Sequence, residues 1–360
     1  MNGLRHLNQF VNNRGFCMLK ELCESRGRMK TDRKEEMIKI LCEEEYGFMP
    51  VTHDKLSWEV VSKDDVFCAG KATLSKVILT AYFGERTFSF PIYVMIPNTD
   101  KKHPFFVHIN FRNNVPDKYM PSEEICDRGF AVISFCHNDV SVDNNSENSS
   151  KYGEGLNDIL FEGIKKEKNH CGKIMMWSWA ASRAMDYAQS LDCLDFTQSA
   201  VVGHSRLGKT ALLTGALDTR FTYVISNDSG CSGAAITRGK KGERVKEIEK
   251  TFPYWFCENY KKYIDNEENL PFDQHFLIAA SAPRKVYVAS AVLDEWADPD
   301  SEYLSCFAAS EAYEALGIKG LVCPDRLPKP GDIFHEGNIG YHLRYGTHYL
   351  SREDWNNFME

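Results

Sequence analysis

The chain has 360 residues, of which 43% are hydrophobic and 26% charged, a composition typical of a globular protein. Its net charge of −8 gives no reason to expect nucleic acid or an acidic membrane surface as a partner. No stretch approaches the roughly 18 consecutive apolar residues of a membrane helix, and the first residues lack the apolar segment of a secretory signal. We therefore expect a cytoplasmic protein without a membrane partner, unless its natural start carries an export signal.

The twelve cysteines are scattered along the chain, and no two of them form a C-x-x-C pair. Several lie in apolar runs, such as Cys136 and Cys306, where a free cysteine usually packs as a small hydrophobic residue. This usage favours neither a zinc site nor a secreted protein held by disulfides. Nothing in the sequence signals a metal or an organic cofactor.

The first 45 or so residues are charged and helix-like. Their apolar positions form only one short face, made by Met37, Ile38, Ile40 and Leu41. We expect a helical extension over residues 1–50 that lies on a larger α/β body formed by residues 51–360.

Strand-like patterns begin after this extension. Two runs around the turn "GER" at 84–86 predict an antiparallel hairpin. Farther along, short apolar strands alternate with helices. The strands are expected at 104–111, 130–136, 199–205, 221–227, 285–292 and 339–346, and the helices at 174–191, 208–217 and 351–360. Apolar strands separated by helices predict a largely parallel sheet with helices on both faces, a three-layer αβα sandwich. The polar stretch at 138–155 is expected to be a surface loop that borders the active site.

The segment "AVVGHSRLGKTALL" reads as a strand, a sharp turn and a helix, with Ser205 at the turn. In α/β hydrolases the nucleophilic serine occupies such a turn, usually written G-x-S-x-G, because small neighbours permit the strained backbone. Here Gly203 is in place, but the second glycine, Gly208, comes one position late. The turn by itself also fits a serine that caps the following helix.

A serine hydrolase also needs an acid and a histidine base, which follow the serine in that order in α/β hydrolases. Two acids end downstream strands: Asp228 and Asp294. His348 lies in the loop after the last strand, where the base is expected. The remaining histidines fit other interpretations: His342 as a structural residue inside the strand, His335 as a weaker candidate base, and His204 and His275 as core or supporting residues.

Six blocks of sequence together resemble the glucuronoyl esterases of carbohydrate esterase family 15: "GHSRLGK", "SNDSGCSGAA", "KGERV", "LPFDQH", "DEWADP" and "RYGTHYLS". The similarity extends over about residues 90–360. It accounts for the late glycine, because the elbow of this family reads G-x-S-R-x-G-K. The resemblance implies an α/β-hydrolase fold and a serine esterase that needs no cofactor.

The family cleaves esters between lignin alcohols and the 4-O-methyl-glucuronate of xylan. By this resemblance Ser205 would attack the glucuronate carbonyl, His348 would serve as base and then acid, and Arg206 would stabilise the oxyanion. Three further matches would bind the sugar: Lys209, Glu243 and Trp296. The partner is then a carbohydrate, with no nucleic acid involved.

One departure concerns the acid. Several family members place a glutamate after the strand that follows the nucleophile, where this chain has the shorter Asp228. The family also has an alternative acid two residues before the tryptophan, which is Asp294 here. We favour Asp294 as the working acid, with Asp228 supporting it or sharing the role. Asp298 is expected to form a turn ahead of Pro299.

Two alternatives remain at this stage. The nearest is an acetyl xylan esterase, or an esterase for another uronate or small ester. Against it, an acetyl group would need none of the sugar-binding residues. The more remote is a non-catalytic carbohydrate-binding protein on a hydrolase fold, which the complete serine, acid and histidine set disfavours. For a cytoplasmic enzyme, imported aldouronate esters would be a reachable substrate. The sequence indicates no oligomeric state.

Overall fold

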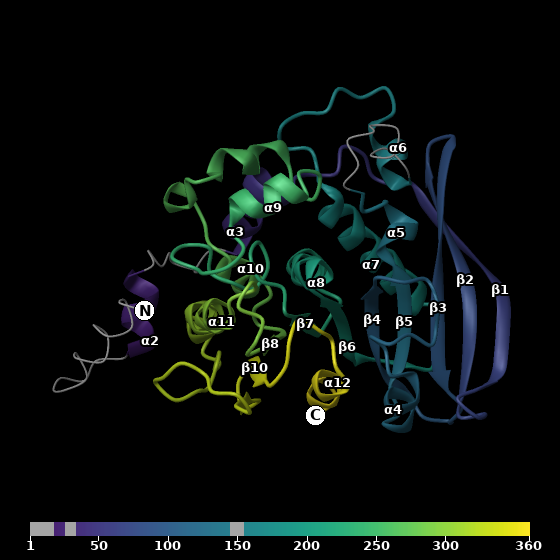
Figure 1. Cartoon of the computed structure of the whole chain (residues 1–360). Helices are drawn as coiled ribbons and strands as arrows, with labels where there is room; N and C mark the ends of the chain where they lie inside the picture. Colours follow the sequence, from purple (N-terminus) through teal and green to yellow (C-terminus); the bar gives the residue numbers. More distant parts are fainter. Residues whose placement is uncertain (1–17, 26–33, 145–154) are drawn as a thin grey trace.

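The computed structural model describes residues 18–25, 34–144 and 155–360 (Figure 1). Its strands are β1 Lys55–Phe67, β2 Ala72–Phe83, β3 Arg86–Pro97, β4 His103–Asn110, β5 Ala131–Cys136, β6 Leu194–His204, β7 Tyr223–Asn227, β8 Lys285–Ala291, β9 Ile333–Phe334 and β10 Ile339–Arg344. Its α-helices are α2 Met18–Ser25, α3 Lys34–Leu41, α4 Ser122–Asp127, α5 His137–Val140, α6 Leu156–Phe161, α7 Lys173–Ala188, α8 Arg206–Leu217, α9 Val245–Thr251, α10 His275–Ala279, α11 Pro299–Glu314 and α12 Arg352–Phe358. A π-helix at Cys42–Tyr46 and 3₁₀-helices at Glu258–Tyr263 and Glu267–Asn269 complete the described elements.

The strands form one 10-stranded sheet in the order β1-β2-β3-β5-β4-β6-β7-β8-β10-β9. The strands from β5 to β10 in this order run parallel to one another. The strands β1, β2 and β3 add an antiparallel edge, and β9 adds a short antiparallel strand at the other edge. The predicted hairpin and the predicted parallel core are therefore confirmed.

Helices cover both faces of the sheet, as predicted (Figure 1). On one face Val107, Val201 and Val224 belong to the hydrophobic cluster that also contains residues of α7, α8 and α11. Their sequence neighbours Phe106 and Val202 point to the other face, where they share a smaller cluster with α4 and α12. This alternation follows from the pleat of a strand, and it makes the sheet the middle layer of three.

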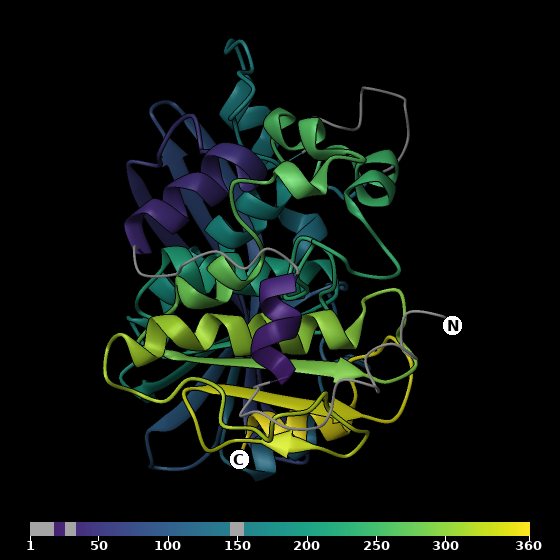
Figure 2. The ribbon, with the colours of Figure 1, turned by 90° about the vertical axis from the view of Figure 1, so that its left-hand side faces the viewer.

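The N-terminal helices pack on the helical layer that covers the face of the sheet with the larger hydrophobic cluster. Helix α2 contacts α11, which crosses the view in Figure 2, and α3 contacts α10. Tyr46, at the end of this segment, is fully buried, and its hydroxyl donates to the Ser232 carbonyl at 2.8 Å. The segment thus belongs to the same hydrophobic cluster as the sheet. The boundary at residue 50 stays a prediction.

Within the described part of the chain, no helix has the length and apolar character needed to cross a bilayer. Every cysteine in the described ranges is a free thiol, and most of these are buried. Burial raises the pKa of several of them; that of Cys257, for example, rises to about 12. Such thiols pack as small apolar residues, as the sequence predicted.

Candidate active site

Ser205 stands at the tip of the turn between β6 and α8. Its backbone has φ 58° and ψ −127°, a combination that L-residues rarely adopt and that the surrounding structure must hold in place. The Ser205 N–H donates to the Asn227 carbonyl at 2.8 Å, which ties the turn to β7. The carboxyl ends of the parallel strands therefore present this serine at the edge of the sheet, with the first turn of α8 behind it.

The two glycines of the turn are explained by close contacts. A Cβ on Gly203 would lie 2.1 Å from the Leu207 carbonyl oxygen, so only glycine fits there. A Cβ on Gly208 would lie 3.0 Å from the side chains of Ser226 and Ser229, where α8 crosses β7. Leu207, at the position of the usual second glycine, is instead fully buried in the core. The late glycine thus lies where the first turns of α8 pack tightly against the end of β7 and the residues after it.

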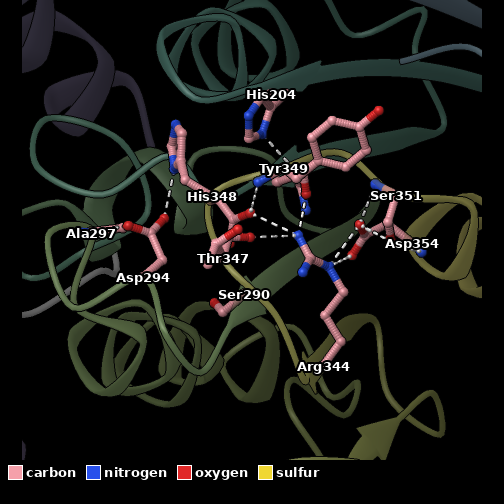
Figure 3. Close-up of polar contacts among 12 residues, drawn as sticks. His204, Ser290, Asp294, Ala297, Arg344, Thr347, His348, Tyr349, Ser351 and Asp354 are labelled. Atoms are coloured by element: carbon pink, nitrogen blue, oxygen red, sulfur yellow. Dashed lines mark hydrogen bonds and ion pairs between the residues drawn. The ribbon is translucent and has the colours of Figure 1, made fainter. Parts of the chain in front are cut away.

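His348 lies in the loop after β10, and its Nδ1 is 2.6 Å from Oδ2 of Asp294, which follows β8 (Figure 3). The Asp294 side chain is 5% exposed and that of His348 is 44% exposed. The ring of His204, the residue before the serine, lies 4.5 Å from the His348 ring. The structure therefore brings the predicted histidine to the serine turn, with Nδ1 engaged by an acid and Nε2 free to act as a base.

Asp228 is placed differently. It follows β7 with φ 45°, and its Oδ2 accepts from Nη2 of Arg344 at 3.2 Å and from the Tyr349 N–H at 3.4 Å. A carboxylate oxygen of Asp228 lies within 4.8 Å of a ring nitrogen of His348, but the hydrogen bond of His348 Nδ1 is made to Asp294. Burial and the negative charge of Glu302, opposed in part by Arg344, raise the pKa of Asp228 well above its usual range.

Arg206, the residue after the serine, forms an ion pair with Asp143. Asp143 also accepts from the Tyr254 hydroxyl and from Nε1 of Trp255, each at 2.9 Å. The Arg206 guanidinium lies 4.6 Å from the centre of the Trp255 ring, a cation–π distance. Although burial opposes it, hydrogen bonding from His137 and the charge of Arg206 hold the pKa of Asp143 well below its usual value. Arg206 is thus fixed beside the nucleophile.

Lys209 lies one helical turn after the serine and is almost fully buried. Its Nζ donates to the Ser229 carbonyl at 2.5 Å and to the Cys231 carbonyl, and it is 3.8 Å from Oε2 of Glu243. The structure therefore joins Lys209 and Glu243 as a pair, with the lysine charge balanced at the base of the site.

Trp296 and Glu243 come from different loops that are locked together. The Glu243 N–H donates to the Trp296 carbonyl at 3.0 Å. The buried Lys240 donates through Nζ to the Glu243 carbonyl at 2.6 Å and to the Trp296 carbonyl at 3.4 Å. The Trp296 side chain remains 56% exposed and forms one wall of a surface cavity of about 470 Å³.

The other singled-out residues have structural partners. In β10, His342 bonds to Asp354 at 2.8 Å, and its other ring nitrogen is 3.0 Å from the Tyr287 hydroxyl. His335 bonds to the same hydroxyl, His204 bonds to Asn227, and His275 is buried beside Phe276. Asp298 caps α11 by accepting from the Ser301 N–H, which confirms its predicted turn.

Sequence reasoning missed three charged residues that support the site: Asp143, Lys240 and Arg344. Asp143 is far in sequence from Arg206, which it holds, and Lys240 and Arg344 hold backbone carbonyls. No motif with a fixed spacing in the sequence therefore points to these residues. Asp143 does fall in the loop predicted to border the active site; residues 145–154 of that loop lie outside the described residues. A signal for Arg344 was its place in the block "RYGTHYLS", four residues before His348.

Comparison with known proteins agrees with this arrangement. The family model described as "Glucuronyl esterase, fungi" matches residues 79–317. A curated relative, the carbohydrate esterase MZ0003 from an unknown prokaryotic organism, is 46% identical over 194 residues, which cover 54% of this chain and 44% of that protein. A 4-O-methyl-glucuronoyl methylesterase of Podospora anserina is 31% identical over 199 residues, 52% of this chain and 40% of that protein. The chain thus spans less than half the length of these curated relatives.

Solved structures match over most of the chain. A promiscuous CE15 esterase from a marine bacterial metagenome has a TM-score of 0.82 and 31% identity, with 91% of this chain and 90% of that chain covered. A glucuronoyl esterase of Solibacter usitatus has a TM-score of 0.82 and 30% identity, with 91% of each chain covered. The α/β-hydrolase fold, the turn at Ser205 and these matches agree, and the chain belongs to the glucuronoyl esterases of carbohydrate esterase family 15.

Proposed function

We propose that this protein is a serine esterase that hydrolyses esters of glucuronate or 4-O-methyl-glucuronate, as in lignin–glucuronoxylan linkages or fragments of them. The observation that carries the proposal is the hydrogen bond between His348 and Asp294 beside the strained Ser205 turn. A second cluster beside the same turn supports the choice of acyl group. It joins Lys209, Glu243 and the exposed Trp296.

The reaction proceeds in two acyl-transfer steps. Nε2 of His348 takes the proton from the Ser205 hydroxyl as its oxygen attacks the ester carbonyl carbon. The histidine then gives this proton to the leaving alcohol, and a glucuronoyl ester of the serine remains. Water, deprotonated by the same histidine, attacks that ester. The bond between the acyl carbon and the Ser205 oxygen breaks, the histidine returns the proton to this oxygen, and glucuronate is released. Asp294 keeps the imidazole in the required tautomer and stabilises its protonated form.

Arg206 stabilises the negatively charged oxygen of the tetrahedral intermediates. Its backbone N–H belongs to the first turn of α8, where N–H groups point out of the helix and favour negative charge. Its guanidinium stays charged at any working pH and offers several donors. Because Asp143 and the Trp255 ring hold that guanidinium, it requires little rearrangement when charge develops on the substrate oxygen.

The sugar-binding assignments rest on position. Lys209 and Glu243 form an acid–base pair that suits vicinal hydroxyls, which both donate and accept. Trp296 offers an apolar ring face to a pyranose. The Podospora relative is named a 4-O-methyl-glucuronoyl methylesterase, which supports a glucuronate ester as the substrate class for this chain.

An alternative is an esterase of broader range, which takes acetyl xylan or other small esters. The favouring observation is the match to a relative described as a promiscuous CE15 esterase. The two functions differ in what they require of the enzyme around the acyl group, because an acetyl group needs neither the Lys209–Glu243 pair nor Trp296.

A paired hydrolysis assay tests the proposal. Purified protein receives benzyl glucuronate and, separately, acetylated xylan or 4-nitrophenyl acetate, with Ser205→Ala as the control. We expect rapid release of benzyl alcohol that falls by about 10³-fold or more in Ser205→Ala, because the nucleophile is lost. Deacetylation without cleavage of the glucuronate ester would instead support the alternative and remove the proposed roles of Lys209, Glu243 and Trp296.

A further inference from the structure

A buried guanidinium lies under the loop that carries His348. Arg344 is the last residue of β10 and is 3% exposed. Its Nη2 donates to the Thr347 carbonyl at 3.2 Å and to the Tyr349 carbonyl. These carbonyls belong to the residues immediately before and after His348, so one side chain holds the backbone on both sides of the histidine (Figure 3).

The same guanidinium is anchored to two other elements. Its Nε donates to Asp354 at 2.9 and 2.8 Å, and Asp354 belongs to the first turn of α12. Its Nη2 also donates to Asp228 at 3.2 Å, after β7. Asp354 is in turn fixed by His342 and by the Ser351 hydroxyl, at 2.8 and 2.7 Å. The Arg344 guanidinium is therefore a rigid reference point rather than a mobile surface group.

The shape of the loop fits this role. Gly346 has φ 132°, and a Cβ at this position would lie 2.5 Å from Nη1 of Arg344. A glycine is required because the chain leaves β10, passes directly over the guanidinium and returns toward α12. The His348 side chain, by contrast, is 44% exposed, and it contacts the Asp294 carboxylate and the His204 ring. Its direction therefore depends on how firmly its backbone is held.

We propose that Arg344 is a positioning residue, which orients His348 toward Ser205 by holding the Thr347 and Tyr349 carbonyls against the anchors Asp228 and Asp354. The inference rests on the proposed function, because it takes His348 as the base of the reaction. It also gives Asp228 a task distinct from that of the working acid: to anchor the guanidinium.

Arg344→Lys is the first test. A lysine keeps the positive charge between the two carboxylates, but its single nitrogen cannot reach both carbonyls and both anchors. We expect kcat for benzyl glucuronate to fall by about 10- to 100-fold with KM within about twofold of the wild-type value, the scale of a small misplacement of a catalytic group. A purely structural role would lower the melting temperature but leave the kcat of the folded protein unchanged.

The chain offers a matched control in Arg284, which also holds backbone carbonyls through its guanidinium. It donates to Phe221 at 2.9 Å, to Gly215 at 2.5 Å and to Asp218 at 3.2 Å, at the opposite end of the strands. Arg284→Lys is expected to lower the melting temperature without changing kcat. A loss of kcat equal to that of Arg344→Lys would overturn the proposal, because it would reflect general loosening.

A second variant covers the case in which Arg344→Lys does not fold. Gly346→Ala leaves every charge in place but pushes the loop away from the guanidinium, and the same loss in kcat is expected. Its control is Gly317→Ala, because Gly317 also has positive φ, at 75°, but has open space around it. The proposal is wrong if kcat of Gly346→Ala equals that of Gly317→Ala.

The rate at which a fluorophosphonate labels Ser205 separates this inference from the proposed function. The reagent needs an activated serine but no sugar. If the wild-type protein is labelled but does not cleave benzyl glucuronate, the proposed substrate is wrong, and the positioning inference is judged on labelling alone. Slower labelling in Arg344→Lys and Gly346→Ala than in their controls then supports it, and equal labelling overturns it.

Discussion

At the scale of single residues, the environment of each acid decides which one serves the histidine. Asp294 is hydrogen-bonded to Nδ1 of His348, whereas Asp228 is bonded to Arg344. An acid that orients an imidazolium must contact the imidazole ring. Asp228 is engaged elsewhere, because its Oδ2 accepts from Nη2 of Arg344 and from the Tyr349 N–H.

This difference predicts unequal effects of the two amide substitutions. Asp294→Asn should lower kcat by about 10²- to 10⁴-fold, because the wrong histidine tautomer is then stabilised. Asp228→Asn should lower kcat by less than about tenfold, because its amide oxygen can still accept from Arg344. Steady-state kinetics on benzyl glucuronate measure both values. The reverse order of effects would make Asp228 the working acid.

The residues proposed to carry the chemistry could be picked out from the sequence because they follow a fixed order along the chain. A serine at a strand-to-helix turn, acids after later strands and a histidine after the last strand are all visible without coordinates. From the sequence, Asp294 could only be ranked above Asp228. The structural difference between them depends on the guanidinium of Arg344, which is 116 positions away from Asp228 in the chain. Lys209 could likewise be identified, but not its burial against the carbonyls of Ser229 and Cys231.

At the scale of elements, the turn between β6 and α8 shows how tertiary contact shapes a motif. A glycine is required at position 203 by the turn itself, since a Cβ at this position would collide with the Leu207 carbonyl. The second glycine is fixed by the approach of α8 to β7. Its position can therefore shift with the packing of the helix, which is why a search for G-x-S-x-G finds only half of the pattern here.

Gly203→Ala tests this reading. A backbone atom 2.1 Å from the new Cβ cannot be avoided by a side-chain rotation, so we expect a loss of about 3 kcal/mol in the free energy of unfolding and slower labelling of Ser205 by a fluorophosphonate. Gly84→Ala is the control, because Gly84 has φ 62° but open space. It should cost about 1 kcal/mol and leave labelling unchanged. Chemical denaturation measures the first quantity, and equal losses would refute the explanation.

Among the elements that escaped the sequence analysis, β1 and α11 did so for clear physical reasons. Strand β1 is exposed along nearly its whole length, so it lacks a buried face and an alternating pattern. Helix α11 is buried almost all around, so its small and polar residues show no amphipathic stripe. The parallel strands were predicted because strands such as β4 and β5 are buried on both faces and therefore consist of continuous apolar residues.

At the scale of the whole molecule, the fold brings distant segments to one edge of the sheet. Ser205 follows β6, Asp228 follows β7, Asp294 follows β8 and His348 follows β10. Because these strands are parallel, their carboxyl ends lie together. The residues proposed to bind the sugar, Lys209, Glu243 and Trp296, belong to α8 and to two loops beyond these ends. The general placement of the site could be predicted from this topology, but the locking of the Glu243 and Trp296 loops through Lys240 could not.

The central claim is that this edge recognises a glucuronoyl group and not merely an ester. The most direct measurement is kcat/KM for benzyl glucuronate and for 4-nitrophenyl acetate in the wild-type protein and in Glu243→Gln. The variant keeps the shape of the side chain but removes the charge that faces Lys209. We expect kcat/KM to fall at least about tenfold more for the glucuronate ester than for the acetate, the scale of a lost charge-assisted hydrogen bond. An equal fall for both substrates would contradict the claim.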